Sequence, residues 1–223
     1  MSFRTLLALV SLTVGGLASS PSAQGATDAQ AIVQRVQARY DATADFTADV
    51  VQEMTIASLN KTMTTHGTVA FKKPGRMRWE FTDGDPQIIV ADGTTLWFYK
   101  PKETQVFKAP FNAAFRSATP ISFLTGVGQL TTDFDVQLDG VTDDGEYLYL
   151  MLVPKKDAGD LGRVRLLITR DSADIRGAEV FDPMGNVSKL RFKNVRRNLG
   201  LSEDKFVFEI PDGVDVINAP IGQ

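Results

Sequence analysis

Arg76-Met77-Arg78-Trp79-Glu80-Phe81 alternates charged and apolar side chains without exception. Successive side chains of a β-strand point to opposite faces of its sheet, so this pattern predicts a strand with one apolar and one charged face. Lys73-Pro74-Gly75 comes just before it and predicts a turn, because proline lacks an N–H and glycine tolerates positive φ. The stretch therefore predicts an antiparallel sheet that buries one face.

The same period of two recurs along most of the chain. Short apolar runs alternate with turns rich in Gly, Pro, Asn and Asp, and strands joined by such tight turns pair antiparallel with their neighbours. Besides 76–81, strands are predicted from Phe46, in a run ending at Phe71, and over 87–90, 94–99, 105–108, 134–138, 147–153, 164–169, 175–181, 187–192 and 206–210.

Two segments have helical signals instead. Thr27 and Gln30 have the spacing of a capping box, and the apolar residues between Ile32 and Tyr40 recur at helical spacing, which predicts an amphipathic N-terminal helix. Thr119-Pro120 begins a short apolar helical segment between the two groups of strands, with Pro120 at the first helical position. This segment is interpreted either as a plug at the end of a barrel or as a movable lid.

These elements together predict a mainly β (α+β) fold. We expect strands paired antiparallel with their neighbours, an N-terminal helix, and a short helical segment between the two groups of strands. A single domain is expected over residues 26–223.

Residues 1–25 have a short basic start, an apolar run over 6–17 and small residues around Ala23 and Gly25, as in a cleavable signal peptide. Export out of the cytoplasm is therefore expected.

Composition excludes several classes of function. The net charge of −3 argues against a nucleic-acid groove, and the absence of cysteine removes thiolate nucleophiles, disulfides and zinc-thiolate sites. His66 is the only histidine and has no nearby serine or carboxylate in the sequence to complete a catalytic set. We therefore expect no catalytic residue, no metal, no cofactor and no enzymatic activity. A basic cluster at Lys72, Lys73, Arg76 and Arg78 is interpreted as a solvated face or as a site for anionic headgroups or a partner.

Four stretches in order resemble the LolA family, the periplasmic carriers of outer-membrane lipoproteins. They are 46–52 (FTADVVQ), 67–80 (GTVAFKKPGRMRWE), 89–99 (IVADGTTLWFY) and 206–216 (FVFEIPDGVDV). The resemblance implies an unclosed antiparallel β-barrel with an N-terminal helix and a short helical lid over an apolar cavity. It also implies a periplasmic chaperone that carries lipoproteins from the inner to the outer membrane, with their acyl chains in that cavity. The implied partners are these acyl chains, an inner-membrane ABC-type lipoprotein-releasing complex and an outer-membrane receptor lipoprotein. The protein is expected to be a monomer.

The resemblance also suggests site residues. The acyl-chain cavity is expected to be lined by Met77, Trp79, Phe81, Trp97 and Tyr99. The lid is expected to contain Pro120, Ile121, Phe123 and Leu124. Lys73 stands where the family usually has an arginine that hydrogen-bonds the lid closed, so Lys73 is the expected latch, without the planar fork of donors that arginine has.

Two other functions stay open from the sequence. The same architecture would suit a carrier of free lipid or glycolipid, or the sensor module of an envelope-stress system. Aliphatic chains leave no residue-specific signature on a cavity wall, so the sequence does not separate these cargoes.

Overall fold

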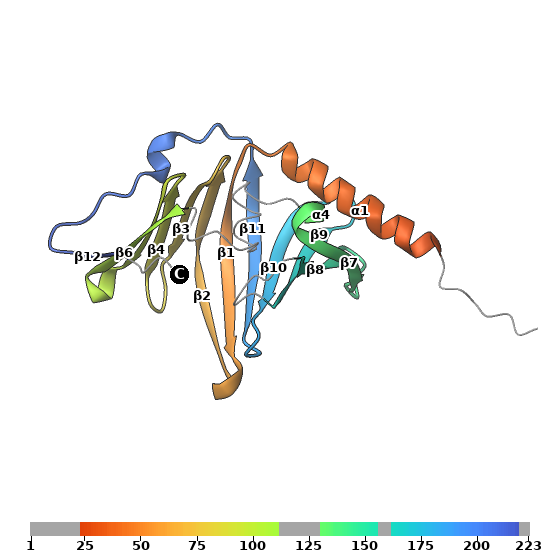
Figure 1. The fold of residues 1–223 in the computed structure, drawn as a ribbon, viewed down its shortest axis with the longest axis horizontal. Coiled ribbons are helices and arrows are strands. Elements are labelled where there is room, and N and C mark those ends of the chain that lie inside the picture. Colours follow the sequence, from red (N-terminus) through yellow and green to blue (C-terminus); the bar gives the residue numbers. More distant parts are fainter. Residues whose placement is uncertain (1–22, 112–129, 156–161, 219–223) are drawn as a thin grey trace, which may run out of the picture.

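The computed structural model describes residues 23–111, 130–155 and 162–218 (Figure 1). The expected lid residues Pro120, Ile121, Phe123 and Leu124, and the expected signal peptide up to residue 22, lie outside these ranges. The elements are α1 Ala23–Asp41, β1 Asp45–Ile56, η1 Ala57–Leu59, β2 Lys61–Lys72, β3 Arg76–Phe81, β4 Gln87–Asp92, β5 Thr95–Lys100, η2 Pro101–Glu103, β6 Gln105–Pro110, α4 Leu130–Asp133, β7 Phe134–Val141, β8 Tyr147–Pro154, β9 Arg163–Thr169, β10 Ile175–Phe181, β11 Val187–Arg197, η3 Glu203–Phe206 and β12 Asp215–Asn218.

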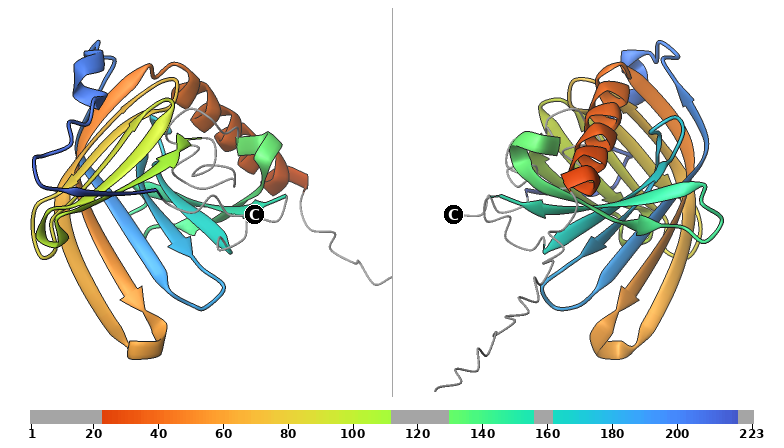
Figure 2. Two further views of the ribbon diagram at one scale, coloured as in Figure 1. Left: turned by 60° about the vertical axis from the view of Figure 1, so that its left-hand side comes forward. Right: turned by 90° about the vertical axis from the view of Figure 1, so that its right-hand side faces the viewer.

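The described strands form one 12-stranded sheet that curves strongly without closing (Figure 2). Its order is β12-β6-β5-β4-β3-β2-β1-β11-β10-β9-β8-β7, so β12 and β7 are edges that do not pair with each other. Neighbouring strands are antiparallel, except that β12 runs parallel to β6. The predicted unclosed antiparallel architecture is confirmed, with this one parallel pair added.

Strand β3 has the two faces that its sequence predicts. Its burial alternates along the strand, and Met77, Trp79 and Phe81 are all buried. The register sets Phe71 of β2 opposite Met77, and Met77 opposite Ala91 of β4. Because paired residues share a face, these side chains belong to one apolar inner face, on the concave side of the sheet.

Helix α1 covers part of this inner face. In Figure 2 it runs across the mouth of the curved sheet. Val33 and Val36 are buried and belong to the hydrophobic core, while Gln37 accepts a hydrogen bond from the backbone N–H of Leu130 at the start of α4 (3.1 Å). The helix begins at Ala23. The predicted start at a Thr27 capping box is therefore wrong, although the amphipathic pattern that follows is confirmed.

The C-terminal segment crosses the outer face of the sheet. The predicted strand over 206–210 is wrong, because the segment forms the short helix η3 and then an extended stretch that pairs with no described strand until β12. The buried carboxylate of Asp45 anchors the start of the crossing by accepting hydrogen bonds from the backbone N–H groups of Leu199, Gly200 and Leu201 (2.7, 3.0 and 3.1 Å). Phe206 is buried and Phe208 packs against Trp97 and Tyr99 on the face of the sheet, whereas Ile210 is exposed.

A buried carboxylate also ties three strands together on the outer face. Glu179 of β10 is 2% exposed and accepts hydrogen bonds from Arg165 of β9 (2.8 Å) and Arg191 of β11 (2.6 Å). Burial raises the pKa of Glu179, but the hydrogen bonds from Arg191 and Arg165 outweigh this effect and leave the pKa below its ordinary value. The cluster therefore favours the ionised carboxylate and stabilises this half of the sheet.

We predict that Glu179→Gln lowers the free energy of unfolding by about 2–3 kcal/mol, because it leaves two arginines without their carboxylate. This loss of stability is smaller than for a fully buried ion pair, because the side chains of Arg165 and Arg191 are 30% and 34% exposed and stay partly hydrated. Urea unfolding at neutral pH measures the change. The matched control is Glu53→Gln at an exposed position of β1, expected to shift stability by less than about 0.5 kcal/mol. Equal effects at both positions would contradict this role for Glu179.

Candidate functional site: the inner face of the sheet

A row of aromatic side chains crosses the inner face over four neighbouring strands. We define the aromatic row as Phe192, Phe46, Phe71, Trp79 and Phe81. Consecutive ring centroids lie 6.4, 4.8, 6.1 and 5.7 Å apart, and the Phe46 and Phe71 rings are stacked. Such pairs each contribute about 0.5–1.5 kcal/mol beyond the area they bury. The row is thus a stable wall of uncharged side chains facing the interior.

Three of the five predicted cavity residues lie on the inner face of the sheet. Met77, Trp79 and Phe81 share the inner face, and all three belong to the hydrophobic core. Their placement follows from the period of two in β3, in which the intervening residues are charged and point to the outer face.

The other two predicted cavity residues lie on the opposite face, so the prediction for Trp97 and Tyr99 is wrong. Both are packed against Phe208 of the C-terminal segment, with ring centroids 5.6 and 5.8 Å away. In β5 it is Leu96 that pairs with inward-facing Ala91 of β4. Strand β5 is apolar on both faces because the C-terminal segment covers its outer side, and alternation in the sequence cannot show which face is inside.

Lys73 links the β2–β3 turn to α1. Its ammonium donates a hydrogen bond to the backbone carbonyl of Tyr40 (2.5 Å) and lies 3.6 Å from the centroid of the Tyr40 ring. Burial lowers the pKa of Lys73 below its ordinary value, against an opposing effect of nearby Asp41. The resemblance to the family suggests that this residue holds a lid; among the described residues its partner is the end of α1.

The rest of the basic cluster is paired within the protein. Lys72 and Arg76 both form ion pairs with Glu203 of the C-terminal segment, the former at 2.7 Å, and Arg78 pairs with Glu80 at 2.5 Å. The two pairs with Glu203 hold the segment against the outer face. Each of these three cations thus has a carboxylate partner, with Lys72 and Arg76 sharing Glu203, which favours a structural role for the cluster over a site for anionic headgroups.

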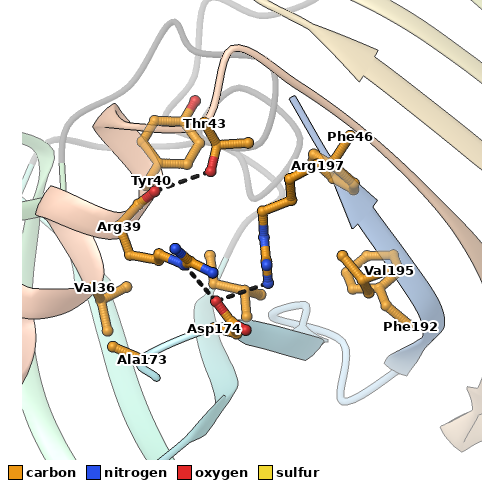
Figure 3. Close-up of a pocket in the computed structure, with 11 residues that line it drawn as sticks. Val36, Arg39, Tyr40, Thr43, Phe46, Ala173, Asp174, Phe192, Val195 and Arg197 are labelled. Atoms are coloured by element: carbon orange, nitrogen blue, oxygen red, sulfur yellow. Dashed lines mark hydrogen bonds and ion pairs between the residues drawn. The ribbon is translucent and has the colours of Figure 1, made fainter. Parts of the chain in front are cut away.

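A second polar contact holds α1, and no feature of the sequence predicts it. Asp174, in the turn between β9 and β10, accepts hydrogen bonds from Arg39 of α1 and Arg197 of β11, each at 2.7 Å (Figure 3). Burial raises the pKa of Asp174, but the hydrogen bonds from the two arginines outweigh it and leave the pKa below its ordinary value. Arg39 and Asp174 are 135 residues apart, so no local pattern could have revealed the pair.

A small cavity lies beneath this contact (Figure 3). Its volume is about 40 Å³, and its walls are largely apolar. The side chains that line it are Val36, Arg39, Tyr40, Thr43, Phe46, Ala173, Asp174, Ile175, Phe192, Val195 and Arg197. Pockets that hold a small molecule span about 300–1,000 Å³, so this space is a seam between α1 and the sheet and too small for a lipid chain.

Larger hollows occur on the outer face, on both sides of Arg78. One of about 380 Å³ is lined by charged side chains that include Glu80 and Arg196. The other, of about 430 Å³, lies between the sheet and the C-terminal segment and includes Tyr99 and Phe208 together with Glu209. The charged wall of the first hollow suits water or a polar partner better than an acyl chain, whereas the second combines apolar side chains such as Ile88 and Phe208 with charged ones.

Nothing in the described residues resembles a catalytic or metal centre. The side chains of His66 and Asp83 form an exposed pair at 2.6 Å, and the imidazole bonds no hydroxyl group of the described residues; the Thr82 hydroxyl donates to the His66 backbone carbonyl instead. No group of three or more potential metal ligands was found over 23–111, 130–155 and 162–218. Within the same ranges, none of the helices has the length and apolarity required to cross a bilayer. The inner face remains the feature best suited to bind a ligand.

Comparison with known proteins agrees with the motifs in the sequence. The family model described as "Outer membrane lipoprotein carrier protein LolA" matches residues 41–209. A protein of Dechloromonas aromatica named outer-membrane lipoprotein carrier protein is 32% identical over 151 residues, covering 68% of this chain and 70% of that protein. A protein of Cupriavidus taiwanensis with the same name is 34% identical over 161 residues, covering 72% and 74%.

Solved structures support the fold. The crystal structure of an uncharacterized conserved protein from Thermus thermophilus matches with a TM-score of 0.54 at 17% identity. The match covers 86% of this chain and 99% of that chain. At this identity the likeness concerns the fold alone.

We predict that Asp174→Asn lowers the free energy of unfolding by about 1–3 kcal/mol at neutral pH, since two arginines lose their carboxylate while Arg39 stays partly hydrated. The pKa of Asp174 is lowered in the folded protein, so its contribution is complete above its ordinary value of 3.8 and is lost as the pH falls through the lowered value. Urea unfolding of wild type and Asp174→Asn at a series of acidic pH values should show that their difference in unfolding free energy shrinks below pH 3.8.

The control for this prediction is Asp171→Asn, at an exposed position of the same turn, which should leave stability nearly unchanged. A difference between wild type and Asp174→Asn that stays constant on acidification would contradict the ionised contact.

Proposed function

The chain belongs to the LolA family of outer membrane lipoprotein carrier proteins, and we propose that it carries lipoproteins through the periplasm by sheltering their acyl chains against the inner face of the sheet. The observation that carries this proposal is the aromatic row on a concave wall that is not closed into a barrel. Such a wall offers a large apolar surface whose cover is a separate element, α1.

The energetics explain why a carrier is needed. Burying one CH₂ group is worth about 0.8 kcal/mol, so a chain of about fourteen carbons amounts to roughly 11 kcal/mol. A lipoprotein anchored by several such chains does not leave a membrane unaided at a useful rate. The proposed carrier replaces the membrane's apolar surroundings with its own wall. It acts by binding and release, without catalysis.

Loading requires α1 to move away from the sheet. The space beneath its C-terminal end is about 40 Å³, much less than an acyl chain occupies. The polar contacts that hold this end include Lys73 with Tyr40 and Asp174 with Arg39. Arg35 also donates hydrogen bonds to the backbone carbonyls of Arg170 and Asp171. Hydrogen bonds that stay partly hydrated contribute about 0.5–1.5 kcal/mol net, so the contacts can open without unfolding the sheet.

The cellular setting is part of the proposal. The protein would be exported through a signal peptide over residues 1–25, receive cargo from an inner-membrane ABC-type releasing complex, and deliver it to an outer-membrane receptor lipoprotein. It would work as a monomer. These points rest on the family to which the chain belongs.

We predict that Trp79→Glu lowers the amount of bound lipoprotein by about tenfold or more, because it places a carboxylate on the apolar wall, where an unpaired charge is costly. Mature protein is added to spheroplasts, and released inner-membrane lipoproteins are measured in the soluble fraction as stoichiometric complexes. The control is Val153→Glu, which introduces the same charge at a side chain that is 40% exposed. Circular dichroism checks that each variant is folded.

Each outcome of this experiment decides between functions. Release by wild type and Val153→Glu but not by Trp79→Glu supports the proposal. Normal loading of Trp79→Glu would contradict it. Uptake of a free acyl probe without any lipoprotein release would indicate a carrier of other lipids, and neither release nor uptake would favour a sensor.

We predict that Lys73→Met speeds the uptake of a fluorescent acyl probe by about fivefold, because it removes the bond to Tyr40 while keeping an apolar stem. Stopped-flow fluorescence measures the rate. Lys61→Met, at the exposed end of β2, serves as the control and should leave the rate unchanged. Equal rates for wild type and Lys73→Met would show that Lys73 does not hold the mouth closed.

A further inference from the structure

The indole N–H of Trp79 is a buried donor without an acceptor among the described residues. Trp79 is 3% exposed, and its Nε1 atom has no hydrogen-bond partner in that part of the chain. Buried N–H groups in native proteins are nearly always paired, and tryptophan is favoured in cores where its N–H reaches an acceptor. We therefore expect the indole N–H of Trp79 to have a hydrogen-bond acceptor that is not among the described residues of the wall.

The described surroundings of the indole are apolar. The Phe71 ring lies edge-on at 6.1 Å and the Phe81 ring is tilted at 5.7 Å. The residues paired with Trp79 on the neighbouring strands are Val69 and Ile89. A water molecule needs two to four polar partners, which these side chains do not offer, and an aromatic face is a weak acceptor.

The other tryptophan of the chain shows the contrast. Burial raises the pKa of Asp92, but hydrogen bonds from Thr94 and Thr95, together with the nearby side chain of Trp97, leave that pKa below its ordinary value. Trp97 lies on the outer face, packed on Phe208. The outer indole thus lies near a carboxylate, whereas no described residue gives the inner one an acceptor.

We infer, on the basis of the proposed function, that the Trp79 indole N–H donates a hydrogen bond to a fatty-acyl ester carbonyl of the bound lipid. The hydrocarbon of an acyl chain has no acceptor, whereas the ester at its head has a carbonyl oxygen that can enter an apolar site if it meets a donor. Trp79 is then a specificity-determining residue, which sets how deeply the chains lie along the wall.

Ester and ether lipids with identical chains test this directly. The probes are a diacylglyceryl-cysteine lipopeptide and its dialkyl ether counterpart, measured by titration with wild type and with Trp79→Phe, which keeps an aromatic ring but removes the donor. Wild type should bind the ester about five- to tenfold more tightly than the ether, and Trp79→Phe should bind both alike. Trp97→Phe is the matched control and should keep the preference.

A second pair of probes, diacyl and dialkyl phosphatidylglycerol, tests whether the ester preference is limited to lipoproteins or extends to other acyl lipids. An ester preference for the lipopeptide alone assigns the site to lipoprotein cargo, and the same preference for both pairs assigns it to acyl esters in general. Both results support the hydrogen bond.

A spectroscopic readout is independent of affinity. The chain has two tryptophans, so Trp97→Phe leaves Trp79 as the only indole. Its N–H proton resonance should move downfield when the ester lipid binds, relative to the ether lipid. An ester-to-ether ratio that is the same in wild type and Trp79→Phe, or a resonance that does not distinguish the two lipids, would overturn the inference. If wild type bound neither lipid, the proposed function would fail as well.

Discussion

The structure depends on one constraint, which is that an apolar sheet face must be kept from water although the sheet does not close. In a closed barrel the strands themselves enclose the interior. Here the edges β12 and β7 do not pair with each other, so the inner face needs another element to cover it. Helix α1 provides part of that cover by burying Val33 and Val36. The arrangement joins a fixed apolar wall to a cover that is not part of the sheet.

The fixed and movable parts are held by different forces. The sheet is held by backbone pairing, by the aromatic row, and by the buried carboxylate of Glu179, which accepts hydrogen bonds from Arg165 and Arg191. The C-terminal end of α1 is held by Lys73 and by Asp174. Arg39, the α1 partner of Asp174, is 46% exposed, so that contact is weakened by solvent. In the proposed loading step, cover and wall separate while the sheet stays intact.

The sequence was sufficient where side-chain alternation was unambiguous and insufficient where it was not. Strand β3 alternates charged and apolar residues, and its inner face was predicted correctly. Strand β5 is apolar on both sides because Phe208 covers Trp97 and Tyr99, so its inner face could not be identified. The contact between Arg39 and Asp174 joins distant segments and leaves no local pattern. The unpaired indole of Trp79 is likewise a property of packing, which only the folded chain reveals.

The central claim is that acyl chains lie on the inner face beneath α1, and a lipopeptide with a photoreactive group in its acyl chain tests it most directly. After irradiation of the loaded protein, mass spectrometry identifies the residues that were crosslinked. The account predicts crosslinks to the aromatic row, at Phe71, Trp79 and Phe81. Crosslinks confined to Tyr99 and Phe208 would place the lipid in the outer hollow under the C-terminal segment and would contradict it.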